Sequence, residues 1–199
     1  MELAKTSLFS IEEWENEINT ESSSKTYFYN GEIISMAPTG WDHGEIQSKL
    51  SELLAPYRYN KKSHGGPPFG THFCWKFISE ASVKYLDGKY GFIHDLAGWK
   101  MQNWQQPTIK SAISSAPDWV CEILSPSNSS KDFVDVKQAL LLAKVPFYWI
   151  VDISRKRIIC YSLENNYSIG EEFKTENKSV VIIPPFPLEL NLENLFDLA

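Results

Sequence analysis

Residues 116–152, APDWVCEILSPSNSSKDFVDVKQALLLAKVPFYWIVD, constrain the fold more than any other part of the chain. Two short apolar runs, 119–124 and 145–152, flank a segment with helical periodicity. Near-continuous apolar runs indicate strands buried on both faces of a sheet, and the Ser/Pro/Asn stretch at 125–128 ends the first strand. A strand–helix–strand unit of this length implies a right-handed crossover and parallel pairing. The segment therefore predicts a sheet that is flanked by helices and contains a parallel pair.

The predicted crossover helix begins at Ser129 or Ser130. Either serine can cap a helix. The negative charge of Asp132 in the first turn is favourable next to the positive, N-terminal end of the helix dipole. Apolar residues then recur at spacings of three and four and form one stripe. These residues are Phe133, Val136, Leu140 and Ala143.

The remaining elements follow from local signals along the chain. Ser10 with Glu13 predicts a capping box that opens a helix over 10–18, and Asn30-Gly31 predicts a hairpin within 27–36. A second helix is expected over 45–57 and a third over 190–199. Strands are expected at 73–78 and 81–86, which can form one bent strand, and at 90–97, 157–163, 167–173 and 179–183.

Length and composition indicate one domain of a soluble globular protein. The 199 residues suffice for a sizeable core, and 43% of them are hydrophobic and 22% charged. We expect a single domain spanning 1–199. No run is long enough to cross a bilayer and the first residues lack the apolar centre of a signal peptide, so the cytoplasm is the expected location. The three cysteines, Cys74, Cys121 and Cys160, are expected to be reduced, buried thiols.

The charge distribution limits the ways in which the protein can contact nucleic acid. A formal net charge of −6 argues against non-specific coating of nucleic acid, because phosphate contacts require Lys and Arg. Local basic clusters remain, one formed by Arg58, Lys61 and Lys62 and another at 155–157. The second lies between two predicted strands, so a solvated hairpin turn explains it better than a binding surface.

Two acids in apolar strand contexts, Asp95 and Glu122, are the candidates for chemistry. A buried carboxylate costs several kcal/mol unless it is paired or binds a cation. Mg²⁺ is held by one or two carboxylates and keeps its other positions for water and phosphate. Lys137, on the helix after Glu122, could orient or deprotonate water. In the structural alternative, Asp95 caps a turn and Glu122 pairs with Lys137.

Several segments together resemble a known family. They are GEIISMAPTGWDHGEIQ at 31–47, GGPP at 65–68, Ser79-Glu80, HDLAGWK at 94–100, APDWVCEILSPSN with Asp132, and VPFYWIVD. From about residue 10 to about residue 161, the chain resembles the Uma-type restriction endonuclease family of the PD-(D/E)XK nuclease superfamily. This resemblance implies a restriction-endonuclease-like core of mixed α/β (α+β) class, in which helices flank a central mixed β-sheet. It also implies hydrolysis of phosphodiester bonds in DNA with Mg²⁺ or Mn²⁺.

The resemblance assigns roles to specific residues. Asp95 and Glu122 stand for the two motif acids and would bind the metal ion together with the backbone carbonyl of Ile123. The lysine that usually follows the second acid by two residues is absent, and the resemblance points to Lys137 on the following helix instead. Glu80 and Glu45 are weaker candidates for a third acid.

Three positions depart from the family pattern. His94 replaces the proline before the first acid, and we expect a neutral strand residue there rather than a phosphate contact. The literal Pro117-Asp118 pair is a decoy, because four residues of strand place Asp118 roughly 13 Å from Glu122. Lys137 follows Asp132 by five residues rather than the family's four, a rotation of about 100° on a helix. Lys131 and Lys137 therefore compete for the lysine role.

Three hypotheses follow. The leading one is a Mg²⁺-dependent DNA endonuclease, for which a symmetric homodimer would be the simplest way to cut both strands. The second is a catalytically inactive binding or regulatory module with the same fold, which predicts that Lys137 points away from Glu122. The third is a small-molecule binding protein that uses the aromatic loops near Trp41, Trp99 and Trp104, although aromatic residues there more often pack the core.

Overall fold

The computed structural model describes residues 8–20, 25–59, 74–108, 111–124 and 130–198. Some of the sequence features discussed above lie outside these residues. They are Ser129, the basic pair Lys61 and Lys62, and the stretch 65–68.

A mixed β-sheet forms the centre of the described structure. Its strands are β1 (Thr26–Tyr29), β2 (Glu32–Ser35), β3 (Trp75–Tyr85), β4 (Tyr90–Lys100), β5 (Trp119–Leu124), β6 (Phe147–Asp152), β7 (Arg157–Ser162) and β8 (Glu171–Lys174). They follow the order β2-β1-β4-β5-β6-β7-β8, and β3 pairs with β4. The predicted mixed sheet is confirmed, since β5 and β6 are parallel and the other neighbouring pairs of this sheet are antiparallel.

The strand–helix–strand unit forms as predicted. Strand β5 pairs with β6 from Trp119 opposite Phe147 to Leu124 opposite Asp152. In the connecting helix α3 (Ser130–Leu142), Val136 and Leu140 of the predicted stripe are buried, whereas Ala143 follows the helix and is half-buried, and the side chain of Phe133 lies outside the described part. This unit places Glu122 in the centre of the sheet with α3 directly after it.

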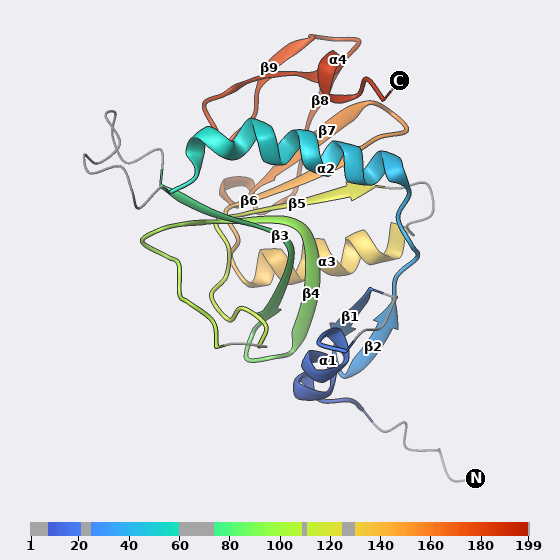
Figure 1. The fold of residues 1–199 in the computed structure, drawn as a ribbon, viewed down its shortest axis with the longest axis vertical. Helices are drawn as coiled ribbons and strands as arrows, with labels where there is room; N and C mark the ends of the chain where they lie inside the picture. Colours follow the sequence, from blue (N-terminus) through green and yellow to red (C-terminus); the bar gives the residue numbers. More distant parts are fainter. Residues whose placement is uncertain (1–7, 21–24, 60–73, 109–110, 125–129, 199) are drawn as a thin grey trace.

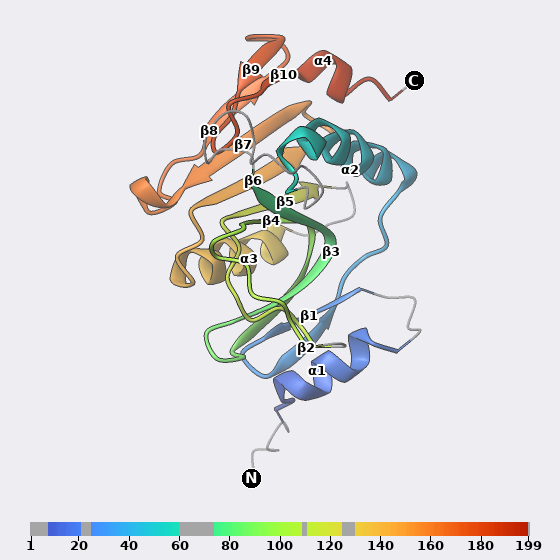
Figure 2. The same cartoon turned by 60° about the vertical axis from the view of Figure 1, so that its left-hand side comes forward.

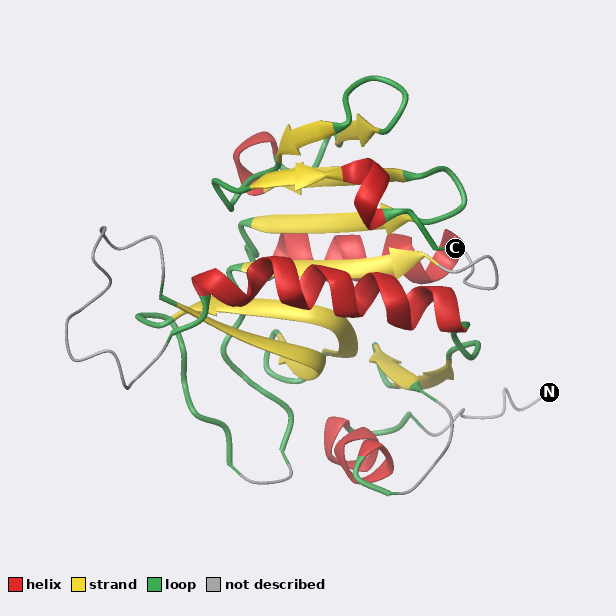
Figure 3. Ribbon diagram, turned by 45° about the horizontal axis from the view of Figure 1, so that its top comes forward, coloured by secondary structure: helices red, strands yellow, loops and turns green. Residues whose placement is uncertain are grey.

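Helices cover both faces of the sheet. Helix α2 (Trp41–Leu54) crosses one face, and α3 lies behind the other (Figures 1 and 3). Because side chains alternate along a strand, β5 contributes Cys121 and Ile123 to the core with α2 and Val120 to the core with α3. The side chain of Glu122, which alternates with Cys121 and Ile123, therefore starts from the α3 face of the sheet, between the two hydrophobic cores.

The N-terminal segment agrees with the local signals. Helix α1 (Ile11–Ile18) begins with the predicted capping box of Ser10 and Glu13. The β1–β2 hairpin turns at Asn30 and Gly31, whose φ angles of 51° and 90° lie in the left-handed region that this kind of turn requires.

Some boundaries differ from the predictions. Helix α2 begins at Trp41, four residues before the expected start at 45, and a 3-10 turn (Ala55–Tyr57) follows it. The predicted helix over 190–199 consists of strand β10 (Glu189–Asn191) and the short helix α4 (Leu192–Leu195). Strand β10 pairs with β9 (Val180–Ile182), and Figure 2 shows this ribbon next to α4, at the end of the molecule far from the N-terminus.

The basic segment 155–157 forms the predicted turn between β6 and β7. Arg155 and Arg157 both bind the buried carboxylate of Asp152, which explains their charge without a ligand. The three cysteines are free thiols, as expected, and Cys121 and Cys160 are buried, but Cys74 is only half-buried, contrary to the prediction. None of the described helices is long and apolar enough to cross a membrane.

Candidate active site

Three acids lie side by side across neighbouring strands. The β4–β5 ladder ends with Leu96 opposite Cys121, so Asp95 and Glu122 are the next residues of the two strands beyond the last pair. The β3–β4 pairs on either side of position 80 place Glu80 opposite Asp95. Like charges at directly opposed strand positions destabilise a sheet. The repulsion within this row of acids therefore lowers the stability of the folded protein, so stability alone does not account for the acids.

Asp95 is held by a set of donors at the point where the β4–β5 ladder ends. The backbone N–H of Ile123 donates to Asp95 Oδ2 over 2.8 Å. His43 Nε2, from α2, lies 3.0 Å from the same oxygen, and Lys25 Nζ lies 3.3 Å from Oδ1. Burial opposes ionisation of Asp95, but His43, Lys25 and the Ile123 N–H outweigh it and hold the pKa below its ordinary value.

His43 has an incompletely satisfied nitrogen. It is buried, and its Nε2 approaches Asp95 at the length but not the angle of a hydrogen bond. Among the residues that the structure describes, this nitrogen has no hydrogen-bond partner. A buried polar atom of this kind next to a carboxylate is typical of a site that completes its contacts with a ligand or water.

Glu122 is buried and faces Asp95. Its Oε1 lies 2.5 Å from His94 Nδ1. Burial is the largest cause, and the negative charge of Asp95 the next, of a pKa well above the ordinary value for a glutamate. A cation placed between Asp95 and Glu122 would remove this repulsion.

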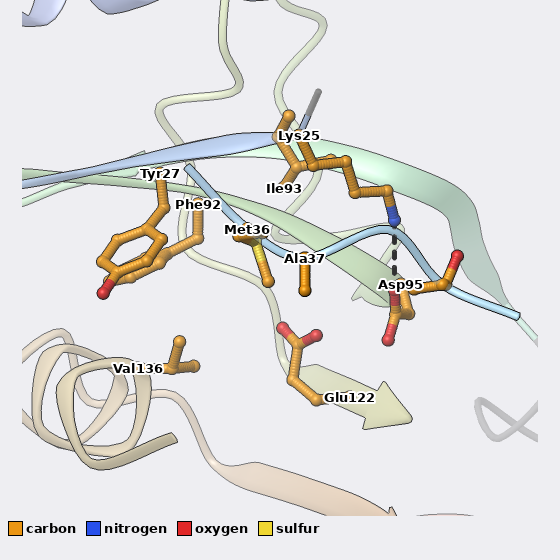
Figure 4. Close-up of a pocket in the computed structure, with 10 residues that line it drawn as sticks. Lys25, Tyr27, Met36, Ala37, Phe92, Ile93, Asp95, Glu122 and Val136 are labelled. Atoms are coloured by element: carbon orange, nitrogen blue, oxygen red, sulfur yellow. Dashed lines mark hydrogen bonds and ion pairs between the residues drawn. The ribbon is translucent and has the colours of Figure 1, made fainter. Parts of the chain in front are cut away.

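Lys25, just before β1, supplies the positive charge nearest to Asp95. Its Nζ forms an ion pair with Glu80 in addition to its contact with Asp95. Burial opposes charge on this lysine, yet Asp95 and Glu80 together raise its pKa. Figure 4 shows Lys25 reaching Asp95 while the Glu122 carboxylate extends from β5 into the same pocket.

His94 is a neutral strand residue, as expected. Its side chain has no exposed surface, and burial lowers its pKa to about 3. The ring bridges two groups, because Nε2 lies 2.7 Å from the hydroxyl of Tyr85 and Nδ1 contacts Glu122.

The two candidates for a third acid have different surroundings. Glu80 joins the site through Lys25 and accepts a hydrogen bond from Gln47 Nε2 over 2.9 Å. Its φ of 51° is unusual for a residue that is neither Gly, Asn nor Asp, and such strain often accompanies function. Glu45 instead pairs with Lys49 on the exposed side of α2.

The pocket between Asp95 and Glu122 is small. Its volume is about 30 Å³, close to that of a single water molecule in the liquid, and its walls include Lys25, Ala37 and Val136. Among the described residues, no group of three or more His, Cys, Asp and Glu could hold a metal ion. Two carboxylates suit Mg²⁺ or Mn²⁺, which takes its other ligands from water and phosphate, better than an ion held in an all-protein cage.

Lys137 lies away from the acids. Its Nζ is 4.0 Å from the centre of the Tyr161 ring, and Val136 is the α3 residue that lines the pocket. The side chain of Lys131 is outside the described part of the chain. The structure therefore brings together Asp95, Glu122 and the backbone of Ile123, but not Lys137.

Asp118 and the tryptophans have other roles. Asp118 accepts hydrogen bonds from the Lys100 N–H over 2.8 Å and from Asn103 Nδ2 over 2.7 Å, so it stabilises the turn after β4. Trp99 is buried and packs edge-on against Trp104, as expected for core residues. Trp41 is 72% exposed at the start of α2.

Lys25 and His43 were missed as site residues. Lys25 follows a polar loop and lies 70 positions from Asp95 in the chain, so no local pattern connects them. His43 lies before the expected helix start at 45, and only the earlier start of α2 at Trp41 directs it at Asp95. A buried acid that lacks a nearby basic partner in the sequence is the one signal that such a distant cation should exist.

Comparisons with known proteins agree with this architecture. The family model Uma2, described as "Putative restriction endonuclease", matches residues 10–194. A crystal structure of a protein from Anabaena variabilis ATCC 29413, described as "a putative nuclease belonging to DUF820", matches with a TM-score of 0.70 and 20% identity. The match covers 94% of this chain and 97% of that one, and it confirms the predicted restriction-endonuclease-like fold. No curated protein matches the chain.

Proposed function

The chain belongs to the Uma2 family, and on this premise we propose that it is a nuclease that hydrolyses phosphodiester bonds in DNA with Mg²⁺ or Mn²⁺. The observation that carries the proposal is that Asp95 and Glu122, the residues next to the last β4–β5 pair, line one pocket. Two buried like charges need a cation, and two carboxylates suit one that also binds phosphate.

In this proposal Asp95 and Glu122 hold the ion, with the carbonyl of Ile123 as a further ligand. When bound, the cation supplies Lewis acidity towards a phosphate oxygen and favours deprotonation of water. Asp95 is prepared for this role because its donors keep it ionised. Glu122 loses its unfavourable repulsion only when positive charge enters the pocket.

Lys25 is better placed than Lys137 to act as the lysine of the site. A lysine beside the reacting phosphate stabilises the negative charge that develops in the transition state. Lys25 contacts Asp95 directly, whereas Lys137 lies over an aromatic ring. We therefore propose Lys25 as the catalytic lysine in place of Lys137.

Calorimetry with Mg²⁺ and Mn²⁺, together with plasmid nicking in the same buffers, tests the nuclease function. The wild type should bind the ion and nick DNA, and Glu122→Gln should lose both properties. Lys25→Met should reduce nicking on the order of 10²-fold or more while metal affinity stays the same or rises, because a positive charge is removed. The matched control Lys137→Met should retain both. Loss of nicking in Lys137→Met but not in Lys25→Met would return the lysine role to α3.

A second candidate is a catalytically inactive module with a nuclease fold. The position of Lys137 favours it, and so do the existing partners of both acids, His43 and Lys25 for Asp95 and His94 for Glu122. Absence of metal binding at millimolar concentration, together with intact plasmid, would select this candidate. The possible homodimer stays a prediction and can be checked by sedimentation in the same buffers.

A further inference from the structure

Three buried side chains on adjacent strands form a continuous hydrogen-bonded chain that ends at the candidate site. Tyr85 on β3 contacts His94 on β4 over 2.7 Å, and His94 contacts Glu122 on β5 over 2.5 Å. All three residues are buried, and of the three only Glu122 lines the pocket. Tyr85 and His94 therefore act on the pocket only through Glu122.

The chemistry of these groups determines the direction of the hydrogen bonds when Glu122 is ionised. A carboxylate can only accept, so His94 Nδ1 must carry the proton and donate it. The remaining nitrogen of a neutral imidazole, Nε2, is then an acceptor, and the Tyr85 hydroxyl is the donor to it. In this arrangement every contact in the chain is satisfied, and the tyrosine selects the histidine tautomer that Glu122 needs.

The arrangement also restricts the Glu122 side chain. A free glutamate side chain loses up to about 2 kcal/mol of rotamer entropy when it is fixed, and Asp95 opposite would repel it from the pocket. The bond from His94 to Oε1 holds the carboxylate against that repulsion. Oε2 is then the oxygen without this contact, and it is the one more available to a cation shared with Asp95.

We infer that His94, supported by Tyr85, is a positioning residue that holds Glu122 by Oε1 and so directs Oε2 towards a divalent cation. The cation in this inference comes from the proposed function. The hydrogen-bonded chain of Tyr85, His94 and Glu122 rests on the geometry alone. It accounts for a histidine at the position where the family pattern has proline, since proline has no side-chain donor for Glu122.

A matched pair of variants separates positioning from packing. In His94→Asn the amide nitrogen can take the place of Nδ1 and still donate to Glu122. In His94→Gln the amide reaches the place of Nε2, towards Tyr85, and the donor to Glu122 is lost. Calorimetry should give a Mg²⁺ Kd within about threefold of wild type for the Asn variant and at least tenfold weaker for the Gln variant, at similar melting temperatures. Equal Kd values for the two, or values that follow the melting temperatures, would overturn the inference.

A second measurement distinguishes failure of this inference from failure of the nuclease proposal. In metal-free protein, the proton of a buried imidazole–carboxylate hydrogen bond should resonate downfield of the backbone amides in the ¹H NMR spectrum. It should shift in Tyr85→Phe and disappear in His94→Gln. Its absence in wild type would overturn the hydrogen-bonded chain, whether or not metal binds. Its presence in a protein that binds neither Mg²⁺ nor Mn²⁺ would overturn the proposed function and the directing role of His94, and would leave only the hydrogen bonds.

Discussion

Replacing Glu122 by Gln should stabilise the metal-free protein at neutral and alkaline pH. Gln keeps the shape of the side chain and can still accept from His94, but it removes the charge that faces Asp95. If the two charges were separated by about 5 Å, the spacing of Cα atoms in an antiparallel pair, they would repel by about 3 kcal/mol at an effective dielectric constant of about 20. Lys25 offsets part of this repulsion, so we expect Glu122→Gln to raise the free energy of unfolding by about 1–3 kcal/mol at pH 8.

The gain should depend on pH in a defined direction. Burial and Asp95 raise the pKa of Glu122 in the folded protein, so the folded state binds this proton more tightly than the unfolded chain does. The stability that this proton provides is complete below the ordinary glutamate pKa of about 4.3 and is lost as the pH rises through the higher folded value. The difference between Glu122→Gln and wild type should therefore be small near pH 4 and grow towards pH 8.

Urea unfolding followed by tryptophan fluorescence, with a chelator present, measures this difference. A gain of 1–3 kcal/mol corresponds to a rise in melting temperature of about 2–10 °C for a chain of this size. Glu45→Gln is the matched control, because this exposed acid pairs only with Lys49 and should change stability by less than about 0.5 kcal/mol. A Glu122→Gln protein that is no more stable than wild type at pH 8, or equally stabilised at both pH values, would refute the reasoning.

Three further substitutions test other parts of the structure. Asp118→Ala should reduce the free energy of unfolding by about 1–3 kcal/mol by removing two hydrogen bonds, and calorimetry should show unchanged metal affinity. Tyr167→Phe removes the buried hydroxyl bonded to the Val145 carbonyl and should cost about 1 kcal/mol in urea unfolding. Trp41→Ala should leave stability within about 0.5 kcal/mol of wild type. Under the proposed function, it should weaken binding of single-stranded DNA about tenfold in fluorescence anisotropy, because an exposed tryptophan can stack on a base.

Much of the fold could be predicted because its main signals are local. The capping box at Ser10, the Asn30-Gly31 turn and the strand–helix–strand unit all form where the pattern indicated. The early start of α2 could not be predicted in this way. Gly40 and Gly44 lie within or beside its first turn, and glycines there favour a loop in any local assessment. The packing of Ile46 and Leu50 against β5 outweighs that preference.

The acids of the candidate site could be identified because burial of a carboxylate is visible in an apolar run. Their partners could not, because pairing between strands determines them. Lys137 shows what the sequence could not predict about the site. Its position, one residue later than the family pattern requires, already implied a rotation of about 100°, and the structure places Val136 at the pocket and Lys137 over Tyr161. The choice of Lys25 required knowing that the segment before β1 passes beside β4.

The row formed by Glu80, Asp95 and Glu122 is the feature that separates the two candidate functions. An inactive module has no need to keep three acids opposed across three strands, and neutral residues there would avoid both the repulsion and the strained backbone at Glu80. Lys25 balances only part of this charge. The remaining negative charge lies around a pocket with room for little more than a water molecule, where a divalent cation would complete the balance. The presence of this uncompensated charge around one pocket therefore favours the nuclease proposal over the inactive module.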